Sequence, residues 1–154
     1  MAALDLRNPA LALSYLPTPL TVCQLRPDQP VPPALLDALI DARGEQSFVS
    51  VTRCKDELSV ILPTALFGEL YPSSTAEKPH ESAGPWAALT IAGPLDLSLT
   101  GILHALSGAL KDAGVPIFAS STWNTDYVLI EERYREKADK GLREAGWVFS
   151  DDKK

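Results

Sequence analysis

Two polar stretches of the chain carry the residues best placed to do chemistry. The stretch GPLDLSLTG, Gly93 to Gly101, contains the carboxylate of Asp96, and the stretch STWNTD, residues 121–126, contains that of Asp126. A carboxylate binds a cationic group, and the free N–H groups of a helix that starts near Ser98 or Gly101 would bind an anionic one. Both stretches are also ordinary structure: Asp96 suits the entry to a helix, and the second stretch suits a hairpin turn. Both interpretations stay open from the residues alone.

No catalytic or metal-binding pattern accompanies these carboxylates. His80 and His104 have no Ser, Cys or second His at catalytic spacing, so surface or interface roles are favoured. Cys23 lies in an apolar run and Cys54 in a polar turn, and neither belongs to a metal-binding motif. A Gly-rich phosphate loop is also missing from the sequence. We therefore predict a protein that is not an enzyme and that uses no cofactor or metal.

The elements that must hold the two stretches follow from hydrophobic periodicity in the second half of the chain. WAALTIAG predicts a strand, and helical spacing predicts a helix over Ser98–Asp112 with Gly114 just past its end. VPIFASSTWNTDYVLI predicts a strand, a polar turn and a second strand. EERYREKADKGLREAG predicts a further helix, and WVF predicts a last short strand.

The first half repeats this order. PLTVCQL predicts a strand, PPALLDALIDARG a helix and FVSVTRCKDELSVIL a hairpin. PTALFGEL predicts a second helix, which leaves the last strand of this copy to be supplied elsewhere, for instance by Leu11–Leu16. Residues 68–85 lack apolar periodicity and are rich in Pro, Ser, Glu and Gly, so we predict a linker or surface loop over 71–85.

A shift of 70 residues supports duplication of one unit. It places Phe48, Ser50, Thr52 and Asp56 on Phe118, Ser120, Thr122 and Asp126. The predicted class is α+β, with two ferredoxin-like βαββαβ units whose antiparallel sheets lie side by side and whose helices cover one face. The predicted boundaries are an N-terminal extension over 1–18, a first unit over 19–70, the linker over 71–85, a second unit over 86–150 and a tail over 151–154.

The run GPLDLSLTGILHAL…AGVPIFASSTWNTDYVLI resembles the second half of tandem ACT-domain proteins, a group that includes the CASTOR-type cytosolic arginine sensors. The similarity is strong over Trp86–Phe149 and weaker over Leu20–Leu62. The resemblance implies a non-catalytic regulatory protein that binds a small molecule, usually an amino acid, at an interface between ACT units. It also makes a homodimer or a regulatory protein partner plausible.

The resemblance further implies which residues bind the ligand. They come from the turn that enters the first helix of the second unit, from the hairpin turn of that unit, and from the first unit. The positions are Asp96, Leu97, Ser98, Leu99, Thr100, Gly101, Thr122, Trp123, Asn124, Thr125 and Asp126, with Ser50, Val51 and Thr52 in the first unit. The arginine sensors carry an acidic side chain where this chain has Leu99, so the departure argues against arginine.

Composition narrows the expected partners and the expected location of the protein. The chain has 154 residues, a formal net charge of −6 and no cluster of Lys and Arg, so nucleic acid is not an expected partner. Its apolar runs are too short to cross a bilayer, and its N-terminus lacks a basic leader, so a cytoplasmic location is expected. The alternative function is an ACT-fold interaction protein that binds no ligand and acts through protein contacts.

Overall fold

The structure is a computed structural model, and it describes residues 4–41, 48–76, 78–93 and 101–153. The chain divides into two compact units. The inner unit is Pro17–Trp86, and the outer unit is Met1–Leu16 together with Ala87–Lys154. The inner unit is therefore an insertion in the sequence of the outer one, and we describe each unit by itself.

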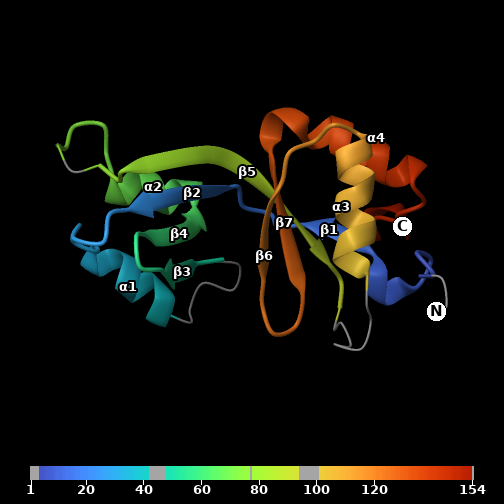
Figure 1. The fold of residues 1–154 in the computed structure, drawn as a ribbon, viewed down its shortest axis with the longest axis horizontal. Coiled ribbons are helices and arrows are strands. Elements are labelled where there is room, and N and C mark those ends of the chain that lie inside the picture. Colours follow the sequence, from blue (N-terminus) through green and yellow to red (C-terminus); the bar gives the residue numbers. More distant parts are fainter. Residues whose placement is uncertain (1–3, 42–47, 77, 94–100, 154) are drawn as a thin grey trace. The chain divides into compact units, whose positions relative to one another are not determined.

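The outer unit is built from a sheet and two long helices. Its strands are β1 (Leu13–Tyr15), the second part of β5 (Glu81–Ile91), β6 (Phe118–Ser121) and β7 (Asp126–Glu131). Its helices are α3 (Ile102–Asp112) and α4 (Arg135–Glu144), with the short 3-10 helices η1 (Pro9–Leu11), η2 (Glu132–Tyr134) and η3 (Ser150–Lys153). β5 lies between β1 and β7, and β6 follows β7 at the end of the sheet (Figure 1).

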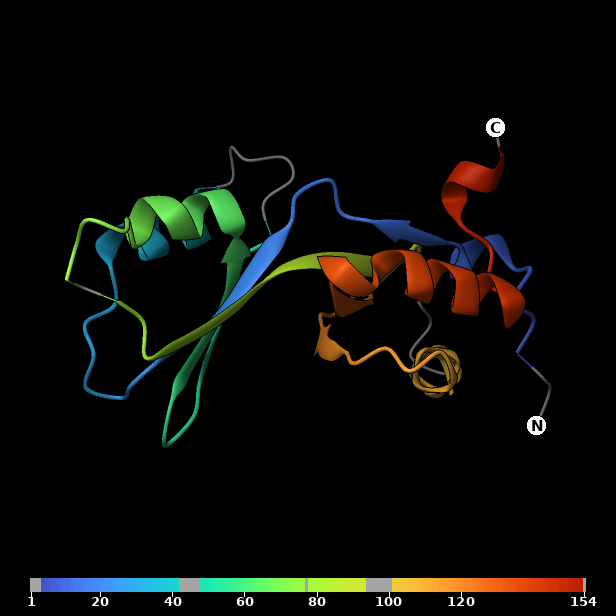
Figure 2. The same ribbon diagram turned by 90° about the horizontal axis from the view of Figure 1, so that it is seen from above.

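The inner unit has the same order of elements. β2 (Leu20–Leu25) is followed by α1 (Pro33–Ile40), β3 (Ser50–Arg53), β4 (Leu58–Pro63) and α2 (Thr64–Leu70). β2 pairs antiparallel with β4 on one side and with the first part of β5 on the other, and β3 lies beyond β4. Figure 2 shows α1 and α2 on the same side of these strands.

Each unit has its own apolar core, on the face of its sheet that the helices cover. In the outer unit, Leu89, Ile91, Val128 and Ile130 of the strands pack with side chains of both helices. Alternate strand positions supply these residues because side chains point to opposite faces along a strand. From the helices come Ile102, Leu106, Leu110, Ala138 and Leu142, which recur at the spacing of one helix face. The inner core likewise joins β2, β4, α1 and α2 around Leu25, Leu35 and Leu62.

The α+β class with antiparallel strands is confirmed, and three local expectations are corrected. The region expected to be a linker contains the start of β5, since Glu81–Trp86 pair with β2. The predicted strand Leu11–Leu16 supplies β1 to the outer unit, where Leu13 pairs with Ile91, and not the missing strand of the first copy. The segment WVF forms one parallel bridge, between Leu13 and Phe149, in place of a strand.

The predicted duplication stays a prediction, although both units run through the same order of elements. The predicted boundaries also differ from the two compact units, because β5 begins in the inner unit and ends in the outer one. Among the described residues, no helix combines the length and apolar character that crossing a membrane would need.

Candidate functional site

The predicted binding turn is described only at its two ends. Asp96, Leu97, Ser98, Leu99 and Thr100 lie outside the described residues. Before them, β5 ends at Ile91 and the chain continues to Gly93; after them, α3 begins at Ile102. The positions of these two ends and of the β6–β7 turn therefore define the part of the candidate site that the structure describes.

A hydrogen bond joins the β6–β7 turn to the end of β5. The hydroxyl of Thr125 donates to the carbonyl oxygen of Ile91 over 3.0 Å. Ile91 is the last residue of β5, two positions before Gly93. The structure therefore joins the β6–β7 turn to the end of the strand that leads toward residues 96–101.

The N-terminal segment holds the same strand end from the other side. The amide of Ala92 donates to the carbonyl of Ala12 over 2.8 Å, and the amide of Gly93 donates to that of Ala10 over 3.0 Å. Asn8 caps this segment through a bond from the amide of Ala10 to its side chain, 3.0 Å long. The sequence did not predict these hydrogen bonds to the N-terminal segment; it predicted only that Leu11–Leu16 would form an extra strand.

The β6–β7 turn uses several of its polar groups internally. Both the amide and the hydroxyl of Thr122 donate to the carbonyl of Thr125, over 2.9 Å and 3.2 Å. The hydroxyl of Ser121 donates to one carboxylate oxygen of Asp126 over 2.6 Å. These bonds fix the turn and orient the Asp126 carboxylate, which lies at the start of β7 and is half-buried.

Two other residues of this turn are open to solvent. Trp123 is 82% exposed, the highest value among the large hydrophobic residues that the structure describes. Asn124 is exposed as well. An indole at the surface offers an apolar face and a ring that can stack on a cation, so this turn can contribute more than hairpin geometry.

Gly101 marks the helix end of the candidate site. It is the residue before α3 and has a φ of 84°, a left-handed conformation that favours glycine. Gly101 has no side chain with which to cap α3, and the first turn of the helix contains no acidic residue. The start of a helix carries a partial positive charge that favours a negatively charged group.

Three of the predicted ligand-binding residues belong to the inner unit. Ser50, Val51 and Thr52 lie in β3 and pair with Ile61, Val60 and Ser59 of β4. Val51 packs against the inner core, while the side chain of Thr52 is exposed. The contacts of these three residues are those of an ordinary strand.

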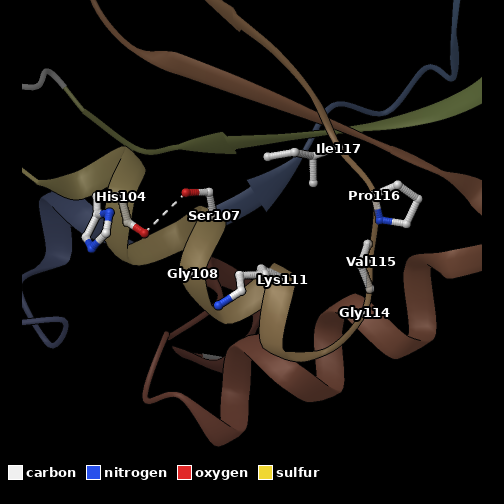
Figure 3. Close-up of a pocket in the computed structure, with 8 residues that line it drawn as sticks. All are labelled: His104, Ser107, Gly108, Lys111, Gly114, Val115, Pro116 and Ile117. Atoms are coloured by element: carbon white, nitrogen blue, oxygen red, sulfur yellow. Dashed lines mark hydrogen bonds between the residues drawn. The ribbon is translucent and has the colours of Figure 1, made fainter.

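A second feature, which the sequence did not predict as a site, is an open hollow beside α3. It has a volume of about 550 Å³, and none of the predicted ligand-binding residues that the structure describes lines it. Figure 3 shows Ser107, Gly108 and Lys111 along α3 and Val115–Ile117 across from them. Ser107 and Gly108 have small side chains or none, so a partner could approach the backbone of α3 closely here.

Two side chains, the buried Cys23 and the half-buried Tyr15, have raised pKa values. Burial raises the pKa of the Cys23 thiol to about 11. The pKa of Tyr15 is raised above its usual range by burial, by its hydrogen bond to Asp139 and by the charge of Asp139. Neither group lies in the turn after β5 or in the β6–β7 turn. Among the described residues, three or more His, Cys, Asp or Glu side chains do not gather where a metal ion could bind.

A comparison with protein-family models indicates the class of domain that part of this fold represents. A family model described as an ACT domain matches residues 81–144, which run from the start of β5 to the end of α4. Residues 81–144 are therefore similar to an ACT domain. The match spans less than half of the sequence, and a search of curated proteins found no match.

Solved structures resemble the chain over most of its length. A protein from Agobacterium tumefaciens shares 28% identity and a TM-score of 0.66, with 90% of each chain covered. A Vibrio cholerae protein of unknown function, described as a "possible transport protein", has 12% identity and a TM-score of 0.64, covering 91% of this chain and 93% of its own. The regulatory subunit of aspartate kinase from Thermus thermophilus, in a ligand-free form, has 16% identity and a TM-score of 0.59, covering 88% of this chain and 97% of its own.

The last two likenesses show the fold alone, because their identities are low.

Proposed function

We propose that this chain is a non-catalytic regulatory protein that binds an amino acid in the outer unit. The carrying observation is the hydrogen bond from Thr125 to Ile91, which joins the β6–β7 turn to the strand end that leads into the predicted binding turn. The proposal assigns the ligand ammonium to the carboxylate of Asp126 and the ligand carboxylate to the first turn of α3.

The chemistry of the described residues supports this assignment. An α-amino acid carries both charges on neighbouring atoms, so it needs an anion and a partial positive charge close to each other. Asp126 supplies the anion, and the start of α3 after Gly101 supplies the N–H groups. Trp123 adds an exposed aromatic face for the ligand side chain. Closure of the site by a second ACT unit, which the resemblance implies, stays a prediction.

A thermal-shift screen with the common amino acids tests the proposal. A ligand at 100 times its Kd stabilises the folded state by about 2.7 kcal/mol, which raises the melting temperature measurably. The active compound is then titrated by isothermal calorimetry against two variants. Asp126→Asn keeps an acceptor for Ser121 and removes the charge, so binding should be lost.

Ser121→Ala is the complementary control, because it removes the hydrogen bond to Asp126 and keeps the charge of the Asp126 carboxylate. Binding should survive in this variant. Equal affinity in Asp126→Asn and in the unchanged protein would exclude Asp126 as the ammonium partner. A screen in which no amino acid shifts the transition would contradict the function itself.

The second candidate is an ACT-fold interaction protein without a ligand. Its support is the exposed apolar side of α1, where Leu36, Leu39 and Ile40 are 48%, 44% and 81% exposed. Three large hydrophobic residues on one short helix exceed the scattered exposure that ordinary surfaces have. A negative amino-acid screen together with a partner that binds this helix would favour the second candidate.

A further inference from the structure

We propose that the hollow beside α3 binds a second class of ligand, a small carboxylic acid with a branched aliphatic tail and no ammonium group. Every residue that lines the hollow belongs to the outer unit, so the site lies within that unit alone. The inference is independent of the proposed function, because Asp126 and Trp123 do not line the hollow and its lining residues, apart from His104, run from Ser107 to Ile117.

One wall of the hollow is the outer side of α3. The lining residues of this helix, which recur at the spacing of one helix face, are His104, Ser107, Gly108 and Lys111. The opposite wall is the segment 114–117, which connects α3 to β6 (Figure 3). The volume of about 550 Å³ lies in the range of about 300–1,000 Å³ that is typical of small-molecule sites.

Gly108 keeps the middle of the hollow open. A Cβ atom added at this residue would meet nothing within 4 Å, so packing against the rest of the chain does not require glycine here. Glycine inside a helix is also less favourable than alanine, by about 1 kcal/mol. The space above Gly108 therefore suits the apolar tail of a ligand that approaches the backbone of α3 closely.

The wall opposite Gly108 is aliphatic and is held by the core of the outer unit. Val115, Pro116 and Ile117 line it. Val115 is 5% exposed and belongs to the outer core, and Ile117 packs against the same core. This wall is therefore in place before a ligand arrives, and it removes an aliphatic tail from water without asking it for a hydrogen bond.

Positive charge lies at one end of the hollow. Lys111 lines it, and the ammonium of Lys137 in α4 lies 3.4 Å from the carbonyl oxygen of Gly114, another lining residue. Asp112 lies 3.7 Å from Lys111, but both side chains are largely exposed, so this ion pair holds Lys111 only weakly. Each ammonium has three N–H donors, so both lysines keep donors for the carboxylate of a ligand.

The same charges select against an ammonium group. Among the residues that the structure describes, no Asp or Glu lines the hollow. An amino acid with its carboxylate at the lysines would therefore hold its ammonium close to two like charges and would find no anion for it. The hydroxyl of Ser107 already donates to the carbonyl oxygen of His104 over 3.2 Å (Figure 3). The preferred ligand thus has one negative charge and an apolar tail, unlike the zwitterion of the proposed function.

Three compounds with similar branched tails test this selectivity in the full chain, with amide chemical shifts as the measurement. Isocaproate has the carboxylate alone, leucine adds an ammonium to it, and isoamylamine has the ammonium alone. Isocaproate should shift the amides of Gly108, Gly114 and Val115 saturably, leucine should bind there about fivefold or more weakly, and isoamylamine should not bind there. The amides of Trp123 and Asp126 report on the proposed amino-acid site separately, so either proposal can fail without the other.

Filling the hollow tests its location. Gly108→Leu should weaken isocaproate binding about tenfold or more, because the new side chain occupies the space of the tail. Gly68→Leu is the matched control, since Gly68 is also a helix glycine with nothing within 4 Å of an added Cβ but belongs to the inner unit; it should leave the affinity unchanged. Circular dichroism verifies that both variants fold.

The charge is tested by Lys111→Gln, which keeps the fold and the apolar wall. It should weaken isocaproate binding by about two- to fivefold, as expected for an exposed ion pair. Three results would each overturn the proposal: no saturable shift around Gly108, equal affinities of isocaproate and isoamylamine, or an unchanged affinity in Gly108→Leu.

Discussion

The hydroxyl of Tyr15 offers a direct test of how the N-terminal strand is attached to the outer unit. Tyr15 lies in β1, and its hydroxyl donates to a carboxylate oxygen of Asp139 in α4 over 2.6 Å. Arg135 lies 4.2 Å from the centre of the Tyr15 ring, and Phe149 stacks on that ring at 6.1 Å. Tyr15→Phe keeps the ring with both of its contacts and removes only the hydrogen bond.

The expected cost follows from the environment of this bond. A hydrogen bond to a charged group contributes about 1.5–3 kcal/mol, and the part-exposed carboxylate regains water when the hydroxyl is removed, so we expect a loss of about 1–2 kcal/mol. Urea unfolding at neutral pH measures it. A double-mutant cycle with Asp139→Ala should give a coupling free energy of about 1 kcal/mol, because each single change removes the same bond.

The pH dependence has a definite sign. The pKa of Tyr15 is raised in the folded protein, whereas an unfolded chain releases a tyrosine proton near pH 10. The stabilising contribution is therefore complete below about pH 10 and is lost as the pH rises further, by about 1.4 kcal/mol at pH 11. The stability difference between the unchanged protein and Tyr15→Phe should shrink between these pH values. Equal stability at neutral pH, or a difference that does not change with pH, would refute the reasoning.

Three further predictions concern backbone and core. Burial raises the pKa of the Cys23 thiol to about 11 in the folded protein, whereas an unfolded chain releases this proton near pH 8.5. The inner unit should therefore lose stability as the pH rises from about 8.5 to 11. Cys23→Val should remove this loss, as urea unfolding across the same pH range can measure. Gly141→Ala should destabilise the protein by about 1–3 kcal/mol, because the added Cβ would lie 2.6 Å from the Cβ of Ala113. Gly68→Ala has open space around it and should stabilise the protein by up to about 1 kcal/mol. Changes in the free energy of unfolding that have the same sign for both variants would contradict this reasoning. Gly101→Ala should cost about 1–2 kcal/mol in thermal unfolding, because its φ of 84° disfavours any side chain, and no cost would show that the backbone relaxes.

The sequence predicted best those elements whose signal is local. The β6–β7 hairpin was correct because two apolar runs flank the polar residues 122–125. The body and the end of α3 were correct because its leucines repeat at helical spacing, but the predicted start at Ser98 was wrong, since Gly101 has a left-handed conformation and the helix begins at Ile102. The first part of β5 was missed because Glu81–Pro85 are exposed, so its side chains show no alternation. This segment is a strand through its backbone pairing with β2, and a single sequence does not reveal that partner.

The attachment of β1 was missed for a related reason. Leu13 and its partner Ile91 are far apart in the sequence, and the whole inner unit lies between them. An apolar run such as Leu11–Leu16 predicts that a strand forms, but burial alone does not specify which sheet it joins. The candidate site was likewise predicted only in part. The sequence predicted the β6–β7 turn, whereas the hydrogen bonds from Thr125 to Ile91 and from Gly93 to Ala10 depend on the tertiary fold.

The internal bonds of the β6–β7 turn do not compete with ligand binding. The Ser121 hydroxyl occupies one of the roughly four lone-pair positions of an ionised carboxylate, so Asp126 keeps capacity for an ammonium group. The bond also limits rotation of the carboxylate, which lowers the entropy lost when a ligand binds. The contact within the turn is thus compatible with the ligand contact that we propose for Asp126. It follows that Ser121→Ala should weaken binding without abolishing it, whereas Asp126→Asn should abolish it.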